Sequence, residues 1–316
     1  MIHYRAFRNT DPPAVAAIWR SRAGQPGLTQ PVSADLIQQL VFSKIYFDHE
    51  GLVLAFDDGR PVGFAHAGFG PNEARNDIDT AMGVTCVVVV NPEYEGSTVP
   101  AELLARCEQY LRGRGAKVLY GGGIGPLNPF YTGLYGGSEL PGILATDQEV
   151  CKLFLARGYR EIDRTVLLRR GLADFEVPFD RRQMQLRRQM VVEVTSDALP
   201  CDWWEACTLG DFDLTRFEVV PRAGGPAVAT ATFRAMEPIG SGGVGRRTGL
   251  VDLFVDPALR RRGLAVFLLS EAFRQFGRQG ITVVEAQTMQ HNAHALGMYR
   301  KLGFEQVGQG IVYRKM

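Results

Sequence analysis

The sequence predicts an α/β fold with mixed sheets, arranged as two tandem domains of the same kind. The chain has 316 residues, which suits two domains of about 150 residues each. Apolar residues make up 46% of it and charged residues 22%, as in ordinary folded domains. A strand, turn, helix and strand occur twice in this order, and Pro92 and Gly115 have the same spacing as Pro257 and Gly280. Such self-similarity indicates a repeated structural unit.

The first copy begins with two short helices and a hairpin. The apolar spacing predicts helices at Ala14–Arg20 and Ala34–Leu40. Strands at Leu52–Phe56 and Pro61–Ala67 flank Asp58-Gly59, a dipeptide typical of tight hairpin turns. The repeated pattern follows, with the strand Val84–Val90, the helix Val99–Gly115, the strand Lys117–Tyr120 and a last helix that ends within Leu153–Tyr159.

The second copy has the same order of elements. Its hairpin strands are Thr215–Val220 and Ala227–Met236, joined at Gly224-Gly225. The pattern continues with the strand Leu250–Val255, the helix Gly263–Gln279, the strand Ile281–Ala286 and a last helix that ends within Met298–Phe304. Gly158 and Gly303 stand where a left-handed residue commonly ends a helix. We predict domains at residues 1–175 and 190–316, joined through a charged segment between 170 and 189.

The copies differ in the loop before the last helix. The first copy carries about twenty extra residues there, and loops of that length are usually functional or disordered. They fall in a Gly-rich segment, residues 121–142, whose apolar content argues against disorder. Its large apolar residues are Phe130, Tyr131, Leu134, Tyr135 and Leu140.

Composition excludes several classes of protein. The net charge is +1, so no overall field attracts nucleic acid or an anionic membrane. The five cysteines are scattered without a CxxC pair, which argues against a disulfide framework or a zinc site. The N-terminus lacks the apolar stretch of a signal peptide, and Val84–Val90 is too short to span a bilayer. We therefore expect a cytoplasmic enzyme or binding protein.

The segment Val251–Ala265, VDLFVDPALRRRGLA, predicts a strand, an arginine-rich turn and a helix N-terminus. Free N–H groups and the positive end of a helix dipole suit an anion such as a pyrophosphate. A glycine at 263 lets the backbone approach phosphate oxygens closely. The alternatives are a solvated basic turn or, with Arg246-Arg247, a nucleic-acid contact, which the neutral net charge disfavours.

This segment resembles a known family. The string RRRGLA, Arg260–Ala265, fits the Gln/Arg-x-x-Gly-x-Gly/Ala signature of the GCN5-related N-acetyltransferases. Leu253–Pro257 is similar to the fourth strand of that family, and Asn292–Phe304 is similar to its last helix. The resemblance is close over roughly residues 202–316 and covers the first half in outline only. It implies acetyl-coenzyme A (acetyl-CoA) as cosubstrate, no metal, and direct acyl transfer to an amine.

The resemblance also implies a set of site residues. Tyr299 corresponds to the acid that protonates the departing thiolate, although a tyrosine at the edge of the core is the alternative. Asp252 and Glu285 are candidate general bases, and an ion pair with arginine is at least as good an interpretation of each. The implied contacts to acetyl-CoA are Leu253, Phe254, Val255, Arg260, Arg261, Arg262, Gly263, Leu264, Ala265 and Asn292.

Two further features near Asn292 have alternatives. Asn292 begins a predicted helix, so it either caps that helix or contacts the pantetheine arm. His291 and His294 have a spacing that a metal could use on a helix, but no third ligand is evident. We interpret these histidines as exposed or facing the substrate.

The first copy departs from the signature. Glu93–Thr98 keeps a glycine, Gly96, but has glutamates where the second copy has arginines. Its helix begins with a Ser97 or Thr98 cap, and Phe154 stands in the place of Tyr299. We expect that this degenerate copy does not catalyse transfer, and that it shapes the acceptor site or holds coenzyme A weakly.

The prediction is an acyltransferase of the EC 2.3.1 type that moves an acetyl group from acetyl-CoA to a primary amine. The acceptor is a small-molecule or peptide amine, with no nucleic-acid or membrane partner. An oligomer is possible but not indicated. The alternative is a coenzyme A sensor or scaffold without turnover.

Overall fold

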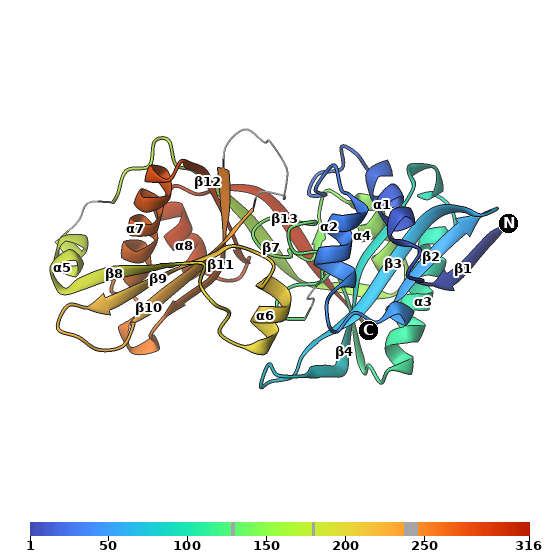
Figure 1. Cartoon of the computed structure of the whole chain (residues 1–316), viewed down its shortest axis with the longest axis horizontal. Helices are drawn as coiled ribbons and strands as arrows, with labels where there is room; N and C mark the ends of the chain where they lie inside the picture. The colour runs from blue at the N-terminus through green and yellow to red at the C-terminus, as the bar shows by residue number, and fades with distance from the viewer. Residues whose placement is uncertain (128–129, 179–180, 237–245) are drawn as a thin grey trace.

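The computed structural model describes residues 1–127, 130–178, 181–236 and 246–316. Their strands form one continuous thirteen-stranded sheet that runs the length of the molecule (Figure 1). We call the elements from β1 to β7 the first half and those from α5 to β13 the second half. Both predicted hairpins form, and Asp58 and Gly59 have the positive φ angles of a tight turn, 44° and 84°.

The first half contains the helices and strands that the apolar pattern predicts, with four additions. A strand precedes the first helix, a π-helical turn extends the second, and two strands follow the long loop. The elements are β1 Ile2–Ala6, α1 Pro12–Ser21, α2 Ala34–Ile37 with the π-turn Gln38–Phe42, β2 Leu52–Asp57, β3 Arg60–Pro71, β4 Ile78–Val90, α3 Val99–Gly113, β5 Val118–Gly121, β6 Ile143–Leu144, α4 Gln148–Ala156 and β7 Tyr159–Gly171.

The second half repeats the order strand, helix, hairpin, strand, helix, strand, helix, strand. A further helix, α5, lies within the charged joining segment. The elements are α5 Arg181–Gln189, β8 Met190–Ser196, α6 Trp203–Leu209, β9 Leu214–Pro221, β10 Ala229–Ala235, β11 Arg246–Val255, α7 Leu264–Arg278, β12 Ile281–Met289, α8 Ala293–Lys301 and β13 Glu305–Lys315.

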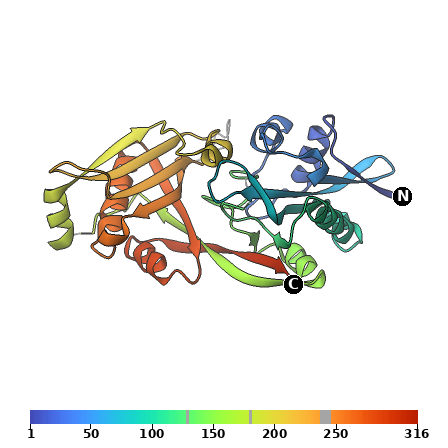
Figure 2. The same ribbon diagram turned by 90° about the horizontal axis from the view of Figure 1, so that it is seen from below.

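The halves are joined by exchange of their last strands. The sheet order is β1-β2-β3-β4-β5-β13-β7-β12-β11-β10-β9-β8. The last strand of the second half, β13, therefore pairs with β5 of the first, and β7 of the first pairs with β12 of the second. β7 and β13 pair antiparallel along almost their whole length at the centre of the molecule (Figure 2).

The two halves share a local distortion of the sheet. β4 has a bulge at Cys86, and β11 has one at Val251, each six residues before the proline that ends the strand region. Beyond these bulges the parallel neighbours part: β4 pairs with β5 only through Thr85, and β11 with β12 only through Gly249. Bulges bend a strand and end its pairing. We call the opening beside Leu250–Val255 the second-half fork and that beside Cys86–Val90 the first-half fork.

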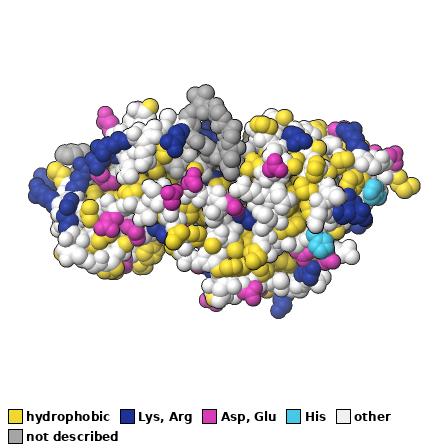
Figure 3. Space-filling view, in the orientation of Figure 1, with side chains coloured by type: hydrophobic (Ala, Val, Ile, Leu, Met, Phe, Trp, Pro, Cys, Tyr) yellow, Lys and Arg dark blue, Asp and Glu magenta, His cyan; other side chains and the backbone are white. Residues whose placement is uncertain are grey.

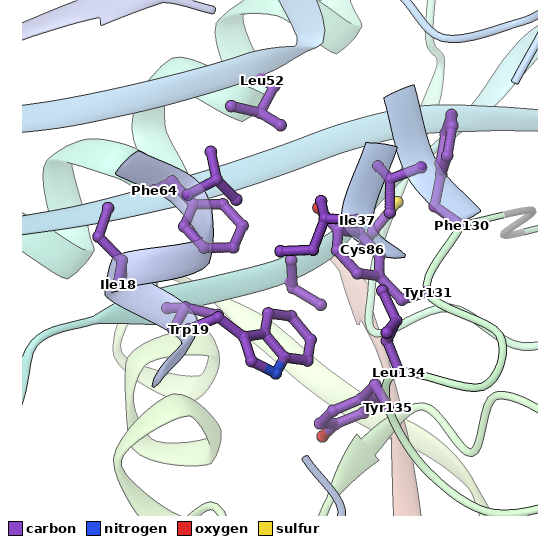
Figure 4. Packing of buried hydrophobic residues seen from close by; sticks show 14 of the residues in the cluster. Ile18, Trp19, Ile37, Leu52, Phe64, Cys86, Phe130, Tyr131, Leu134 and Tyr135 are labelled. Carbon is purple, nitrogen blue, oxygen red and sulfur yellow. The ribbon is translucent and has the colours of Figure 1, made fainter. Parts of the chain in front are cut away.

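Each half has its own apolar core. In the first half, α1 and α2 cover one face of the sheet and α3 and α4 the other, while α7 packs on the second half. The described aromatic residues of the long loop belong to the first core, where Tyr131 stacks on Trp19 at 5.7 Å and Phe130, Leu134 and Tyr135 are buried (Figure 4). The described residues of the loop are thus an ordered part of the fold, as its composition predicts. In the described residues, no helix has the length and apolar character of a membrane span.

Candidate functional site

The second-half fork is the structural centre of the site. On one edge, β11 pairs with β10 from Thr248 to Val255. On its other edge, the described strands leave Leu250–Val255 without a partner, because pairing with β12 stops at Gly249 and Glu285. Backbone N–H and C=O groups alternate between the two edges of a strand, so part of those of Leu253–Val255 face the open edge, where an extended ligand can pair with them.

The fork leads into the N-terminus of α7. Gly263 precedes this helix with a φ of +89°, and no described side chain caps it. The first helical bond there runs from the Phe267 N–H to the Gly263 carbonyl, at 2.9 Å. The N–H groups of Leu264, Ala265 and Val266 therefore come before the first helical bond. A helix of fifteen residues with such a start favours an anion at this end.

Gly263 is required by space as well as by conformation. A Cβ atom at this position would lie 3.3 Å from Nε2 of Gln183, because α5 crosses the start of α7. Gln183 also donates a hydrogen bond to the Gly263 carbonyl. Basic side chains gather at the end of the molecule where α5 lies (Figure 3).

The three arginines of the turn have different partners. Arg260 donates to the Val255 carbonyl at 3.1 Å, which ties the turn to the end of β11. Arg261 has a positive φ of 65° and lies 2.6 Å from the Nε2 atom of His294 on α8. Arg262 is exposed and makes no hydrogen bond or ion pair with the described residues. It is the arginine best able to turn toward a bound phosphate.

Tyr299 lies on α8 with 4% of its surface exposed. Its ring packs against Phe304 at 5.1 Å, in the second-half core. The hydroxyl makes no hydrogen bond with the described residues. Burial raises the pKa of this hydroxyl, and Glu139 raises it further. Tyr299 therefore lies in the core, as the alternative interpretation had it, and its role as an acid stays a prediction.

Asn292 caps α8. Its Oδ1 accepts a hydrogen bond from the Ala295 N–H at 3.1 Å. His291 lies 3.1 Å from an oxygen of Asp163, and His294 faces Arg261. The two histidines therefore point to different partners, and no group of metal-ligating side chains occurs among the described residues.

The two carboxylates chosen from the sequence have unlike surroundings. Asp252 is exposed on β11, and partial desolvation together with the nearby Glu205 raises its pKa. Glu285 is buried on β12, where Oε1 accepts from Arg169 at 2.9 Å and lies 3.5 Å from Arg247. The ion-pair interpretation therefore describes Glu285.

A third carboxylate, which the sequence did not single out, comes from the other half of the chain. Residues 136–142 of the long loop cross to the second-half fork, where a Cβ on Gly249 would lie 2.8 Å from Ser138. Glu139 follows in this loop, and burial near Asp252 raises its pKa to about 8. In the sequence, the only sign of a role for Glu139 is the length of the loop that contains it. Nothing in the local pattern tells which half of the molecule that loop contacts.

The first-half fork lacks these features. In the strand register, Val87 occupies the position that corresponds to Asp252. On the last helix, Phe154 occupies the position that corresponds to Tyr299, and it is fully buried against Tyr313. The Val99 N–H is bound by the Ser97 hydroxyl at 3.1 Å, and Pro100 has no N–H. Of the three positions before the first helical bond, from Glu102 to Thr98, two therefore offer no N–H to an anion.

The structure corrects one detail of that comparison. Gly96 is not the counterpart of Gly263: Thr98 precedes α3, with a φ of −77°, and Gly96 has no left-handed conformation. The expected cap comes from Ser97, whereas Thr98 forms no side-chain cap.

The first-half fork instead borders a cavity of about 220 Å³. Its apolar wall is Val87–Val90, and Glu95 and Asp147 also line it. Glu95 is paired with Arg22, and Gln25 donates to Asp147 at 2.6 Å. Arg22 and Lys152 also line the cavity, each paired with a glutamate, so it offers no free cation among its described residues for a phosphate group.

Comparisons with known proteins agree with this architecture. The family model described as "Acetyltransferase (GNAT) family" matches residues 16–135 and again 187–304. A search of curated proteins found no match.

Solved structures share the fold over almost the whole chain. A GCN5-related N-acetyltransferase from Sphaerobacter thermophilus has a TM-score of 0.65 at 17% identity, with 99% of this chain and 95% of that chain covered. A tandem GNAT protein from the clavulanic acid biosynthesis pathway has a TM-score of 0.69 at 13% identity, covering 99% and 98%.

A third similar structure is the GCN5-related glucosamine N-acetyltransferase region of a fungal multi-domain β-N-acetylglucosaminidase, with a TM-score of 0.72 at 18% identity. It covers 99% of this chain, which spans only 38% of the fungal one. The predicted tandem arrangement of one mixed α/β fold is confirmed. With two matches that together cover more than half of its length, the chain belongs to the GNAT acetyltransferase family, as a tandem member.

Proposed function

We propose that the second half transfers an acetyl group from acetyl-CoA to a primary amine. The observation that carries this proposal is the uncapped N-terminus of α7 at the end of the unpaired β11 edge, a combination that the first half lacks. An acyl-CoA has the matching shape: an anionic pyrophosphate followed by an extended arm that carries amide groups.

The cosubstrate lies along the second-half fork. Its pyrophosphate accepts hydrogen bonds from the first turn of α7 and from Arg262, and its arm pairs with the free edge at Leu253–Val255. The edge directs the thioester toward the bulge at Val251, where β11 and β12 part. Asn292 supports this arrangement indirectly, since its side chain already caps α8.

Tyr299 is the proton donor in this proposal. The amine nitrogen attacks the thioester carbon, the C–S bond breaks, and the thiolate takes the hydroxyl proton. Burial raises the pKa of Tyr299 and so keeps the hydroxyl protonated at neutral pH, the form that a donor needs. Its lack of a hydrogen bond with the described residues leaves that proton free for the sulfur.

The first half acts as a support without turnover. Phe154 has no proton to give, and the start of α3 offers a phosphate fewer N–H groups than the start of α7. Its long loop forms one wall of the second-half fork, which restricts the acceptor to an amine that fits beside residues 136–142.

The test is release of free thiol from acetyl-CoA with a panel of primary amines. We expect Tyr299→Phe to lower kcat by about 100-fold, the usual contribution of a positioned acid, with little change in the dissociation constant of acetyl-CoA. The control is Tyr313→Phe, a second buried tyrosine that packs on Phe154 in the other core and should leave the rate unchanged.

Two outcomes contradict the proposal. Tight binding of acetyl-CoA without thiol release across the panel would instead assign a coenzyme A sensor. A rate that Tyr299→Phe leaves intact would remove the tyrosine from the mechanism.

A further inference from the structure

The long loop of the first half is anchored at the second-half fork on both sides of Glu139. Arg234, a buried residue of β10, donates to the Gly137 carbonyl at 2.8 Å and to the Ser138 carbonyl at 2.7 Å. After Glu139, Gln287 of β12 donates to the Leu140 carbonyl at 2.9 Å. These bonds attach the loop to strands on either side of the fork.

Two more contacts fix its path. The Thr165 hydroxyl of β7 donates to the Pro141 carbonyl at 2.6 Å. A Cβ on Gly137 would lie 3.2 Å from Oε2 of Glu285, so the loop passes closely over the Glu285 ion pairs. With the carbonyls of residues 137, 138, 140 and 141 held, the backbone of residue 139 is fixed beside the fork, and its Oε2 atom lies 3.8 Å from where a Cβ on Gly125 of the same loop would stand.

The Glu139 carboxylate is free of protein partners. It makes no hydrogen bond and no ion pair with the described residues, although the side chain is mostly buried. The neighbouring Glu285 is paired with two arginines, and the buried Arg234 donates to loop carbonyls instead of to Glu139. A buried carboxylate without a partner is unfavourable in a protein interior unless a ligand supplies one.

From these contacts we propose that Glu139 is the general base of the transfer reaction, supplied by the first half to the site of the second. The inference rests on the proposed function. The acceptor arrives as an ammonium ion, because a free primary amine has an ordinary pKa near ~10. Glu139 takes one proton from it and later releases that proton to solvent. The neutral nitrogen forms the C–N bond and loses a second proton, which replaces the one that Tyr299 gives to the thiolate.

The charged groups around Glu139 suit this role. Asp252 of β11 raises the pKa of Glu139, and Arg234 of β10 lowers it. The charge of Glu139 in turn raises the pKa of Tyr299 on α8. Glu285 of β12 also faces the loop, paired with Arg169 of β7 and Arg247 of β11. Burial outweighs these influences and places the pKa at about 8, close to neutral pH, where a base both accepts and releases protons readily.

The experiment compares Glu139→Gln with wild type on ethylamine and on trifluoroethylamine, which differ greatly in basicity but little in size. Thiol release from acetyl-CoA is measured across pH, and acetyl-CoA affinity is measured separately. We expect kcat/KM for ethylamine to fall about 100-fold. The loss for trifluoroethylamine, which is mostly neutral already, should be below about threefold. The break in the wild-type pH profile near pH 8 should disappear in Glu139→Gln, whose rate on ethylamine should follow the fraction of neutral amine and keep rising above pH 8, while Glu139→Asp keeps the break.

The matched control is Glu193→Gln, an exposed glutamate on β8, which should behave as wild type. Equal losses on both amines, or a wild-type rate in Glu139→Gln, would overturn the role of Glu139 and leave the transferase proposal standing. If wild type releases no thiol with any amine, the proposed function falls, and this inference falls with it.

Discussion

The two halves of the molecule share one backbone plan and differ in the side chains at its fork. Each has a bulge six residues before a proline, a parallel pair that parts there, and a last helix closed by a left-handed glycine. Their differences include Asp252 against Val87, Tyr299 against Phe154, and Gly263 against Thr98. The shape of the fork is thus set by the sheet, and in our proposal a few side chains decide which fork supports the transfer reaction.

The cores beside the two forks also differ. The largest effect that we expect is on the stability of the protein in acid, and it comes from a histidine in the first-half core. In the first half, fully buried His66 precedes the bulge, and its Nδ1 lies 3.1 Å from the Tyr131 hydroxyl; the second half has Thr232 there. Burial lowers the pKa of His66 to about 3. Below about pH 6.5 the histidine binds a proton in the unfolded chain but not in the folded chain. The free energy of unfolding therefore falls as the pH decreases.

We expect this histidine to reduce the free energy of unfolding by about 2 kcal/mol between pH 7 and pH 5. Denaturant unfolding at both pH values measures it. His66→Phe should lose this part of the pH dependence, whereas His49→Ala, at an exposed site, should keep it. An identical pH dependence in His66→Phe and wild type would rule out His66 as its source.

The glycine before α7 gives the next largest effect. Gly263→Val places a side chain at a φ of +89° and against Gln183, so the helix start must shift. Strain of this kind is worth about 1–3 kcal/mol, and we expect acetyl-CoA affinity to fall about tenfold. Calorimetric titration measures the dissociation constant.

Gly96→Val is the matched change in the first half. A Cβ there meets nothing within 4 Å and has no positive φ to strain. Its affinity should equal that of wild type. An equal weakening by both variants would mean that the two helix starts contribute alike.

The smallest expected effect concerns charge. Arg262→Ala should weaken acetyl-CoA binding about threefold at low salt, and the difference should shrink as the salt concentration rises. Arg278→Ala removes the same charge from the opposite end of α7 and should change nothing. A threefold loss in both variants would indicate a general effect of net charge.

Much of the fold followed from the sequence because its signals are local. Apolar periodicity and the turn residues Asp58-Gly59 and Gly224-Gly225 predicted the hairpins, and spacing alone predicted the duplication. The short α6 and the last strands β7 and β13 were missed. Alternating polar and charged residues weaken the apolar signal of those strands, for example in Tyr159–Gly171.

The candidate site was predictable where one contiguous segment forms it, as in Val251–Ala265. It was not predictable where it depends on pairing between distant segments. Glu139 carries no local signal, since its position depends on Arg234 and Gln287, which lie far along the chain. The sequence identified Glu285 as a candidate, but its partner Arg169 comes beside it only through the pairing of β7 with β12, and Arg247 only through that of β11 with β12.

The exchange of β7 and β13 has a consequence for how the chain comes apart. Neither half forms a complete sheet by itself, because β5 of the first half pairs with β13 of the second, and β12 of the second half pairs with β7 of the first. A cut in the segment between β7 and α5 would leave the two fragments interlocked, and each alone would expose an unpaired strand edge. The first half is therefore needed for the structure of the second: deleting it would remove β7, the strand that pairs with β12 and β13, whatever the first half contributes to the reaction.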